Sequence, residues 1–157
     1  MKSIIYDIDC LIYFLKINRA DLLEKEFDQI IISNKVHNTI SNPSIPEYIR
    51  NILKDLIDSG FVKIEEISLN TAVFDLYYEI INNHENEILG EGEASTIALA
   101  SKSKKPIAYN HPSIIEDYLK KYDLKCLKTE DILERLLSKD IISKKEYLEI
   151  IKEIHYK

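Results

Sequence analysis

Short apolar runs alternate along the chain with longer segments whose apolar residues have helical spacing. Residues 3–8 and 29–32 are continuous runs rich in β-branched and aromatic side chains, which is typical of buried strands. Residues 106–109 and 124–127 predict two further short strands, and residues 61–67, which alternate apolar and polar side chains, predict a less deeply buried one. Helices are predicted between these strands, over residues 11–15, 20–27, 47–59, 69–82, 90–100 and 110–122. Because strands alternate with helices, the pattern indicates a mainly parallel sheet covered on both faces.

Local signals mark where several of these helices begin and end. Gly60 stands where the preceding helix requires a C-cap, and Asn70 or Thr71 is the candidate N-cap of the next helix. Two further helices are predicted to close the chain. The first, over residues 129–138, has acidic residues in its first turn, which suits the helix dipole. The second is predicted to begin at residues 143–146, where S-K-K-E fits the capping-box pattern.

The composition is that of an ordinary globular protein. The 157 residues are 45% hydrophobic and 31% charged, and the chain contains only three Gly and four Pro. A chain of this length can bury a sizeable core, and so few Gly and Pro residues argue against a long flexible linker. We therefore expect a single domain over residues 1–157.

The net charge of −6 limits the classes of function. Phosphate contacts supply most of the affinity of nucleic-acid binders, so an acidic balance argues against a non-specific DNA-coating protein. It does not exclude a nuclease, because metal-binding carboxylates add negative charge locally. Neither Cys10 nor Cys126 belongs to a C-x-x-C motif, so we expect no zinc site and two reduced thiols in a cytoplasmic protein. The apolar N-terminal stretch is broken by Asp7 and Asp9 and is too short to span a membrane, so no membrane association is expected.

Two polar residues that end predicted strands are the first candidates for a ligand site. Asp7 ends the first strand, and Asn110 follows the strand over residues 106–109. Ligands of parallel α/β sheets bind at the carboxyl ends of the strands. Mg²⁺ prefers oxygen ligands and keeps several waters, so one or two carboxylates and a substrate phosphate suffice to hold it. Such an ion activates water for phosphoryl displacement, and this chemistry needs acids that converge from separate elements.

Four segments, in order, resemble motifs of the PIN-domain family of nucleases. The stretch IIYDIDCLIYFLK resembles the first strand of these domains, in which an acid is followed by a small or polar residue and then Leu. The run LGEGEASTIALA is similar to the GEAEAIALA helix of a PIN subgroup common in bacteria and archaea. The strand PIAYN stands where that subgroup has a strand ending in one or two Asp. The tail TEDILERLLSKDIIS resembles the subgroup's closing GTLGILLRAKELGLI segment, so residues 128–157 are expected to form a closing helical hairpin.

The resemblance implies a three-layer α/β/α fold around a mainly parallel sheet and the activity of a metal-dependent ribonuclease, a class that includes the toxins of toxin–antitoxin pairs. Asp7 matches the first family acid, and Glu93 matches the acid that opens the GEAEA helix, so both are carried over as catalytic residues and as ligands of Mg²⁺ or Mn²⁺. Asp9 matches a nearby supporting position. The last family acids fall on Asn110, carried over as a catalytic residue, and on His111, carried over in a supporting role.

The sequence departs from the family pattern at half of the expected acidic positions. The second family acid belongs to a V-Y-E-E-L pattern, whereas this chain has VHNTI over residues 36–40, with Thr39 among them. Asn110 keeps an oxygen ligand but lacks a unit of charge, and His111 suits Mn²⁺ better than Mg²⁺. With two formal charges in place of four, the site is expected to hold Mg²⁺ weakly.

Neighbouring acids are poor replacements for the missing ones. Glu91 lies two residues before Glu93, so the two side chains point apart on a helix. Asp117 lies well inside a predicted helix and is expected to be solvated.

Each candidate also has a structural interpretation that needs no chemistry. Asp7 and Asp9 are both good helix N-caps. Glu93 lies among small residues in a helix expected to be buried, where it requires either a metal ion or a salt bridge to Lys or Arg. Asn110 is a strong N-cap, and Pro112 after it suits a first helical turn.

Two hypotheses follow from the resemblance, and a third ranks last. The first is a metal-dependent endoribonuclease, a toxin or defence effector, that acts on RNA and pairs with an antitoxin or another protein. The second is a degenerate PIN domain that binds a partner, as a regulatory or inactive subunit, and cuts nothing. A homodimer is a family-level expectation in both cases. A nucleotide-binding module unrelated to this family ranks last, because the chain has no G-x-G-x-x-G motif and no P-loop.

Overall fold

A five-stranded parallel sheet forms the centre of the structure, a computed structural model that describes residues 2–83 and 89–156. The strands lie in the order β3-β2-β1-β4-β5, and every neighbouring pair is parallel. Their bounds are Ser3–Tyr6 for β1, Gln29–Ser33 for β2, Val62–Glu65 for β3, Ile107–Ala108 for β4 and Cys126–Leu127 for β5. Each strand falls within or overlaps a predicted one, and the predicted parallel arrangement is confirmed.

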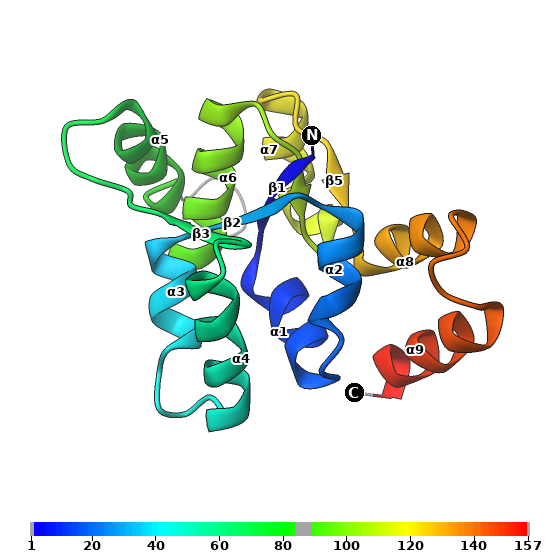
Figure 1. Cartoon of the computed structure of the whole chain (residues 1–157). Coiled ribbons are helices and arrows are strands. Elements are labelled where there is room, and N and C mark those ends of the chain that lie inside the picture. The colour runs from blue at the N-terminus through cyan, green and yellow to red at the C-terminus, as the bar shows by residue number, and fades with distance from the viewer. Residues whose placement is uncertain (1, 84–88, 157) are drawn as a thin grey trace.

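Helices cover both faces of this sheet (Figure 1). They are α1 (Ile8–Lys16), α2 (Ala20–Glu26), α3 (Asn34–Ile40), α4 (Glu47–Asp58), α5 (Ala72–Ile81), α6 (Glu91–Ser103), the 3-10 helix η1 (Pro112–Ile115), α7 (Glu116–Lys121), α8 (Thr129–Ser138) and α9 (Lys144–Tyr156). The last two helices, orange and red in Figure 1, contact each other at the end of the chain. None of the helices in the described part of the chain is long and apolar enough to cross a membrane.

Two hydrophobic cores, one on each face of the sheet, follow from the alternation of side chains along the strands. Ile4 and Tyr6 belong to the core that α1, α2, α4 and α8 cover, whereas Ile5 belongs to the core beneath α5 and α6. Ile30 and Ile31 of β2 divide in the same way. Successive side chains of a strand point to opposite faces, so a sheet covered on both sides requires continuous apolar runs. The predicted three-layer α/β/α fold is therefore confirmed.

The predicted helix ends are realised at several positions. The Thr71 hydroxyl accepts a hydrogen bond of 3.1 Å from the Phe74 backbone N–H and thereby caps α5. Gly60 has a φ of +87°, the left-handed conformation that a glycine after a helix adopts without strain. At the start of α9, the Glu146 N–H donates to the Ser143 hydroxyl at 3.1 Å, and the Ser143 N–H donates to the Glu146 carboxylate at 3.3 Å. The capping box predicted there is confirmed.

Two segments differ from the prediction. Helix α3 lies in a segment for which no helix is predicted. Ser33 caps its start, because the Ser33 hydroxyl accepts a hydrogen bond of 3.0 Å from the Val36 N–H. Only Val36 and Ile40 of this helix are buried. Two apolar residues give too little periodicity to reveal a helix of seven residues. The single helix predicted over 110–122 is divided into η1 and α7. Two consecutive isoleucines lie in η1, and β-branched side chains disfavour a continuous α-helix.

A buried carboxylate fastens α2 to the end of α8. The side chain of Glu26 has no exposed surface, and its two oxygens accept hydrogen bonds of 2.9 and 2.8 Å from the Lys139 ammonium group. The Lys2 ammonium group lies 3.5 Å from the same carboxylate. A buried carboxylate without such partners is strongly destabilising, so these two lysines keep Glu26 compatible with the fold.

We expect Lys139→Met to lower the free energy of unfolding by roughly 1 to 3 kcal/mol, because Lys2 alone then faces the buried Glu26 carboxylate. Urea denaturation measures the change, with Lys145→Met, an exposed lysine outside this cluster, as the control. In the double variant Glu26→Gln with Lys139→Met, part of the loss is expected to be recovered. Equal stability of Lys139→Met and the control would show that the ion pair contributes nothing.

Candidate functional site

The order of the strands makes the carboxyl ends of β1 and β4 the switch point of the sheet, and we call the region around these two strand ends the crevice. The chain winds from β1 through β2 to β3 on one side, and then continues with β4 and β5 on the other side of β1. Ligands of open α/β sheets bind at such a switch point, because the connections leave the two central strands in opposite directions. Asp7 follows β1, and Tyr109 and Asn110 follow β4. The Asp7 N–H donates to the Ala108 carbonyl oxygen at 3.1 Å, which holds the two strand ends side by side.

The carboxyl group of Asp7 is buried in this crevice, with only 2% of the residue exposed. Asp7 occupies the N-cap position of α1, yet its side chain makes no capping hydrogen bond. Its Oδ1 is buried and has no hydrogen-bond partner in the described part of the chain. Burial, followed by the charge of Asp9 and then that of Glu93, raises the pKa of Asp7 to about 7, and the amides of Ile8 and Asp9 only partly oppose this rise.

Glu93 lies in the first turn of α6 and is half-buried. The Gly90 N–H donates to its Oε1 at 3.3 Å, and the Tyr109 hydroxyl donates to its Oε2. The partner of this carboxylate is therefore a tyrosine, and not the lysine or arginine that the alternative interpretation required. Tyr109 is buried, and burial together with the hydrogen bond to Glu93 and the nearby charge of Asp7 raises the pKa of its hydroxyl. The hydroxyl consequently keeps its proton and acts as a donor.

The remaining predicted residues differ in how they relate to the crevice. Asp9 is exposed in the first turn of α1, and its charge acts on the carboxyl group of Asp7. The Asn110 carboxamide oxygen accepts two hydrogen bonds from Thr129, of 2.9 Å from its N–H and 2.8 Å from its hydroxyl. Asn110 thus joins the end of β4 to the start of α8, instead of capping the helix that follows it. His111 is exposed, precedes η1 and makes no capping hydrogen bond.

Thr39, which stands where a family acid is missing, and the two acids considered as replacements all lie at the surface. Thr39 is exposed in the last turn of α3, where its hydroxyl donates to the Lys35 carbonyl oxygen at 3.0 Å. Glu91 and Asp117 are exposed as well, as expected for residues that face away from the crevice. Asp9 and Glu93 lie close enough to Asp7 for their charges to raise its pKa. Neither Glu91 nor Asp117 adds a further carboxylate to this group.

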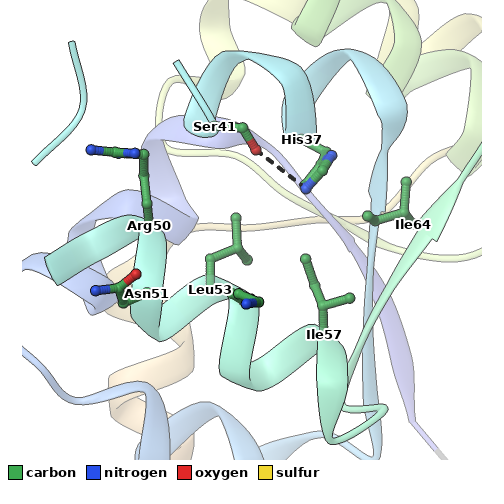
Figure 2. Close-up of a pocket in the computed structure, with 8 residues that line it drawn as sticks. His37, Ser41, Arg50, Asn51, Leu53, Ile57 and Ile64 are labelled. Atoms are coloured by element: carbon green, nitrogen blue, oxygen red, sulfur yellow. Dashed lines mark hydrogen bonds between the residues drawn. The ribbon is translucent and has the colours of Figure 1, made fainter. Parts of the chain in front are cut away.

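A separate hollow of about 400 Å³ lies between α3, α4 and β3 (Figure 2). Leu53 and Ile64 form part of its apolar lining, and Arg50 contributes a cationic side chain. His37, which is half-buried here, and Ser41 form one wall and are joined by a hydrogen bond of 3.2 Å. None of the predicted site residues lines this hollow, so the crevice at β1 and β4 is a different place.

The donor set fits a cation only in part. Among residues 2–83 and 89–156, no group of three or more His, Cys, Asp and Glu side chains converges closely enough to hold a metal ion. The unpartnered Oδ1 of Asp7 and the mutual repulsion of Asp7, Asp9 and Glu93 nevertheless favour positive charge in the crevice. Two carboxylates with several waters are a common way to bind Mg²⁺. The residues present therefore suit one weakly held hard cation.

Sequence reasoning missed Tyr109 and Thr129 as members of the site. Tyr109 ends an apolar run and has the appearance of an ordinary core residue, and its hydroxyl finds Glu93, 16 positions earlier in the chain. Thr129 opens a predicted helix, and Asn110 is 19 positions away. Neither contact has a local sequence signal, because both depend on how separate elements pack.

Comparison with known proteins adds one family and one structure. The model of the family DUF3368, a PIN domain, matches residues 3–157 of the chain. The search of curated proteins found no match to this chain. The crystal structure of FitAcB from Neisseria gonorrhoeae is similar to the chain, with a TM-score of 0.47 and 11% sequence identity, covering 80% of this chain and 97% of that chain.

We expect Asp7→Asn to stabilise the protein at alkaline pH and to have little effect in acid. Because the pKa of Asp7 is raised by folding from 3.8 to about 7, the folded state binds its proton more tightly than the unfolded chain. The stability of the wild type therefore falls as pH rises between these two values. At about pH 8 the variant should be more stable by roughly 2 to 4 kcal/mol, and at about pH 4 the difference should vanish.

Thermal unfolding without divalent cations, followed across this pH range, measures the difference. Asp117→Asn, which removes an exposed carboxylate, is the matched control and should show no such pH dependence. A pH-independent difference between Asp7→Asn and the wild type would mean that the Asp7 carboxylate is not held at an unfavourable site.

Proposed function

Because the chain belongs to the PIN-domain family, whose model matches residues 3–157, we propose that it is a divalent-cation-dependent endoribonuclease. Asp7 and Glu93 bind the cation and Asp9 supports the site. Asn110 and His111 complete its wall on the side of β4. The wall contains fewer acids than the family pattern implies, so the cation is bound weakly and Mn²⁺ serves better than Mg²⁺.

The observation that carries this proposal is the buried, unpartnered Oδ1 of Asp7. A buried carboxylate oxygen without a hydrogen-bond donor costs free energy unless a cation or a proton satisfies it. The oxygen lies at the switch point of the sheet, where Asp9 and Glu93 add negative charge. An unsatisfied carboxylate oxygen beside two further acids supports binding of a metal ion at this place.

Each polar group of the crevice has a distinct role in the proposed reaction. Asp7 and Glu93 would hold a divalent cation, which would supply activation of water and stabilisation of the charge on a phosphodiester. Asp7 would supply a carboxylate whose Oδ1 has no hydrogen-bond partner among the described residues. The Tyr109 hydroxyl donates to Oε2 of Glu93, so a cation has to compete with this hydroxyl for that oxygen. Thr129 engages the carboxamide oxygen of Asn110, so this residue offers its amide nitrogen as a donor to a phosphate oxygen.

The resemblance to toxin nucleases extends the proposal to the partners of the chain. An RNA is the substrate, and an antitoxin or another protein restrains the activity in a toxin–antitoxin or defence role. The homodimer expected of the family remains part of this proposal.

A second candidate is a PIN domain that binds a partner and cuts nothing. Two hydrogen-bond arrangements favour it specifically. The Tyr109 hydroxyl occupies one oxygen of Glu93, and Thr129 occupies the carboxamide oxygen of Asn110. Both groups that would join Asp7 around a cation are thus already engaged by the protein.

We expect cleavage of a mixed RNA pool in the presence of Mn²⁺, with a loss of at least roughly a hundredfold in rate for Asp7→Asn and for Glu93→Gln. The loss follows because each substitution removes one of two formal charges that hold the cation. Glu91→Gln, on the exposed side of the same helix, is the matched control and should cleave like the wild type. Equal cleavage by Asp7→Asn and the wild type would assign the activity to a contaminant.

Calorimetric titration with Mn²⁺ separates the two candidates. Under the nuclease proposal the wild type binds Mn²⁺ in the micromolar range, and Glu93→Gln abolishes this binding. If the wild type binds no Mn²⁺ and cuts no RNA, the second candidate, a domain that binds a partner without cutting RNA, is favoured.

We expect Tyr109→Phe to increase the affinity for Mn²⁺ several-fold, because the hydroxyl no longer competes with the cation for Oε2 of Glu93. The same substitution removes a hydrogen bond to a charged group, so the cation-free protein should lose about 1 to 2 kcal/mol of stability. Calorimetry and thermal unfolding measure the two effects. An affinity equal to or lower than that of the wild type would mean that the hydroxyl orients Glu93 for the cation instead of competing with it.

A further inference from the structure

The amino-terminal edge of the sheet carries a cluster of cationic side chains. All five strands are parallel, so the residues that precede them meet at one edge, opposite the crevice that contains Asp7. Lys2 precedes β1, Lys104 and Lys105 precede β4, and Lys125 precedes β5. Arg135 of α8 lines the same surface. We call these five side chains the basic edge.

Most of the basic edge is not neutralised by the protein. Lys2 lies near Glu26, but none of the ion pairs among the described residues involves Lys104, Lys105, Lys125 or Arg135. Asp123 also lines this surface, and the Asp28 carboxylate accepts a hydrogen bond from the Lys2 backbone N–H. Five cations thus stand against few carboxylates, in a chain whose net charge is −6.

Two hollows along this edge share Lys104, Lys105 and Pro106 in their linings. The first, of about 510 Å³, is lined by Lys2 and Arg135 in addition, and no carboxylate lines it. The second, of about 440 Å³, adds Lys125 and the half-buried Tyr122. Lysines therefore line both hollows, and the second hollow also contains an aromatic ring.

We infer that the basic edge binds the phosphate backbone of single-stranded RNA, at a surface opposite the acidic centre. The inference rests on the proposed RNA substrate and assigns it a second contact region. A lysine ammonium group is a point charge on a flexible side chain, so it can bind phosphates at different positions along an RNA. This property suits an RNA of variable sequence. The Tyr122 ring already stacks on Tyr118 and lies beneath the Lys121 ammonium group, so the cationic side chains alone supply the attraction. The repulsion that the acidic crevice exerts on RNA makes such a separate source of attraction useful to an acidic nuclease.

The test uses the full chain carrying Asp7→Asn, which keeps the RNA intact during the measurement. Fluorescence anisotropy with a labelled single-stranded RNA gives the affinity at several salt concentrations. For Lys104→Glu with Lys105→Glu we expect affinity to fall roughly tenfold or more at low salt. The slope of log affinity against log salt should fall in magnitude by about 1.4, corresponding to two lost phosphate contacts on a single strand. Lys125→Glu with Arg135→Glu should act in the same direction.

The matched control is Lys144→Glu with Lys145→Glu, which reverses two adjacent, exposed lysines at the start of α9, outside both hollows. It should leave affinity and salt slope unchanged, and thermal unfolding verifies that each variant is folded. Equal losses in the control and in Lys104→Glu with Lys105→Glu would overturn the inference, because net charge alone would then explain binding. Binding of a poly-glutamate peptide but not of RNA would also overturn it. If the wild type cleaves RNA but the basic-edge variants bind RNA as well as their Asp7→Asn parent does, the inference is refuted and the proposed nuclease function stands.

Discussion

Burial of the Asp7 carboxylate between the ends of β1 and β4 is the constraint from which the site takes its character. Water is excluded there, two other carboxylates lie near, and one oxygen of Asp7 has no donor among the described residues. Each of these features opposes ionisation, and together they create a place where positive charge is favourable. The hydrogen bond from Tyr109 to Glu93 limits the repulsion by directing the second carboxylate toward a neutral donor. Ionised Asp7 therefore costs the fold stability, and the same carboxylate is the best candidate ligand for a cation.

The two hydrophobic cores offset the free energy that burial of the Asp7 carboxylate costs. Continuous apolar strands such as β2 bury side chains on both faces of the sheet, and the helices on either side complete two cores. Glu26 shows how a buried charge is treated where no ligand is required, because Lys139 satisfies both of its oxygens. The contrast between Glu26 and Asp7 is informative: the same fold neutralises one buried carboxylate with its own lysines and leaves an oxygen of the other unsatisfied. This contrast distinguishes a structural acid from a candidate ligand.

Local patterns in the sequence predicted the parts of the fold that depend on neighbouring residues. The strands, the capping box at Ser143 and Glu146, and the cap at Thr71 all have signals within a few positions. Helix α3 was not predicted, because a seven-residue helix with two buried side chains has no clear period. In the site, the place of Asp7 at a strand end followed from its apolar run. The contact between Tyr109 and Glu93 could not be predicted, because it depends on how α6 packs against β4.

The pairing of β1 with β4 has a further consequence for when the crevice exists. Ile5 pairs with Ile107, and these residues are 102 positions apart (107 − 5). Contacts of such long sequence separation carry a large loop-closure cost and form late in folding. During synthesis the first strand leaves the ribosome long before its partner, so Asp7 remains in water, ionised and separated from Tyr109 and Asn110. The acidic centre therefore cannot form before β4 has been synthesised, and a nascent fragment that ends before β4 lacks it.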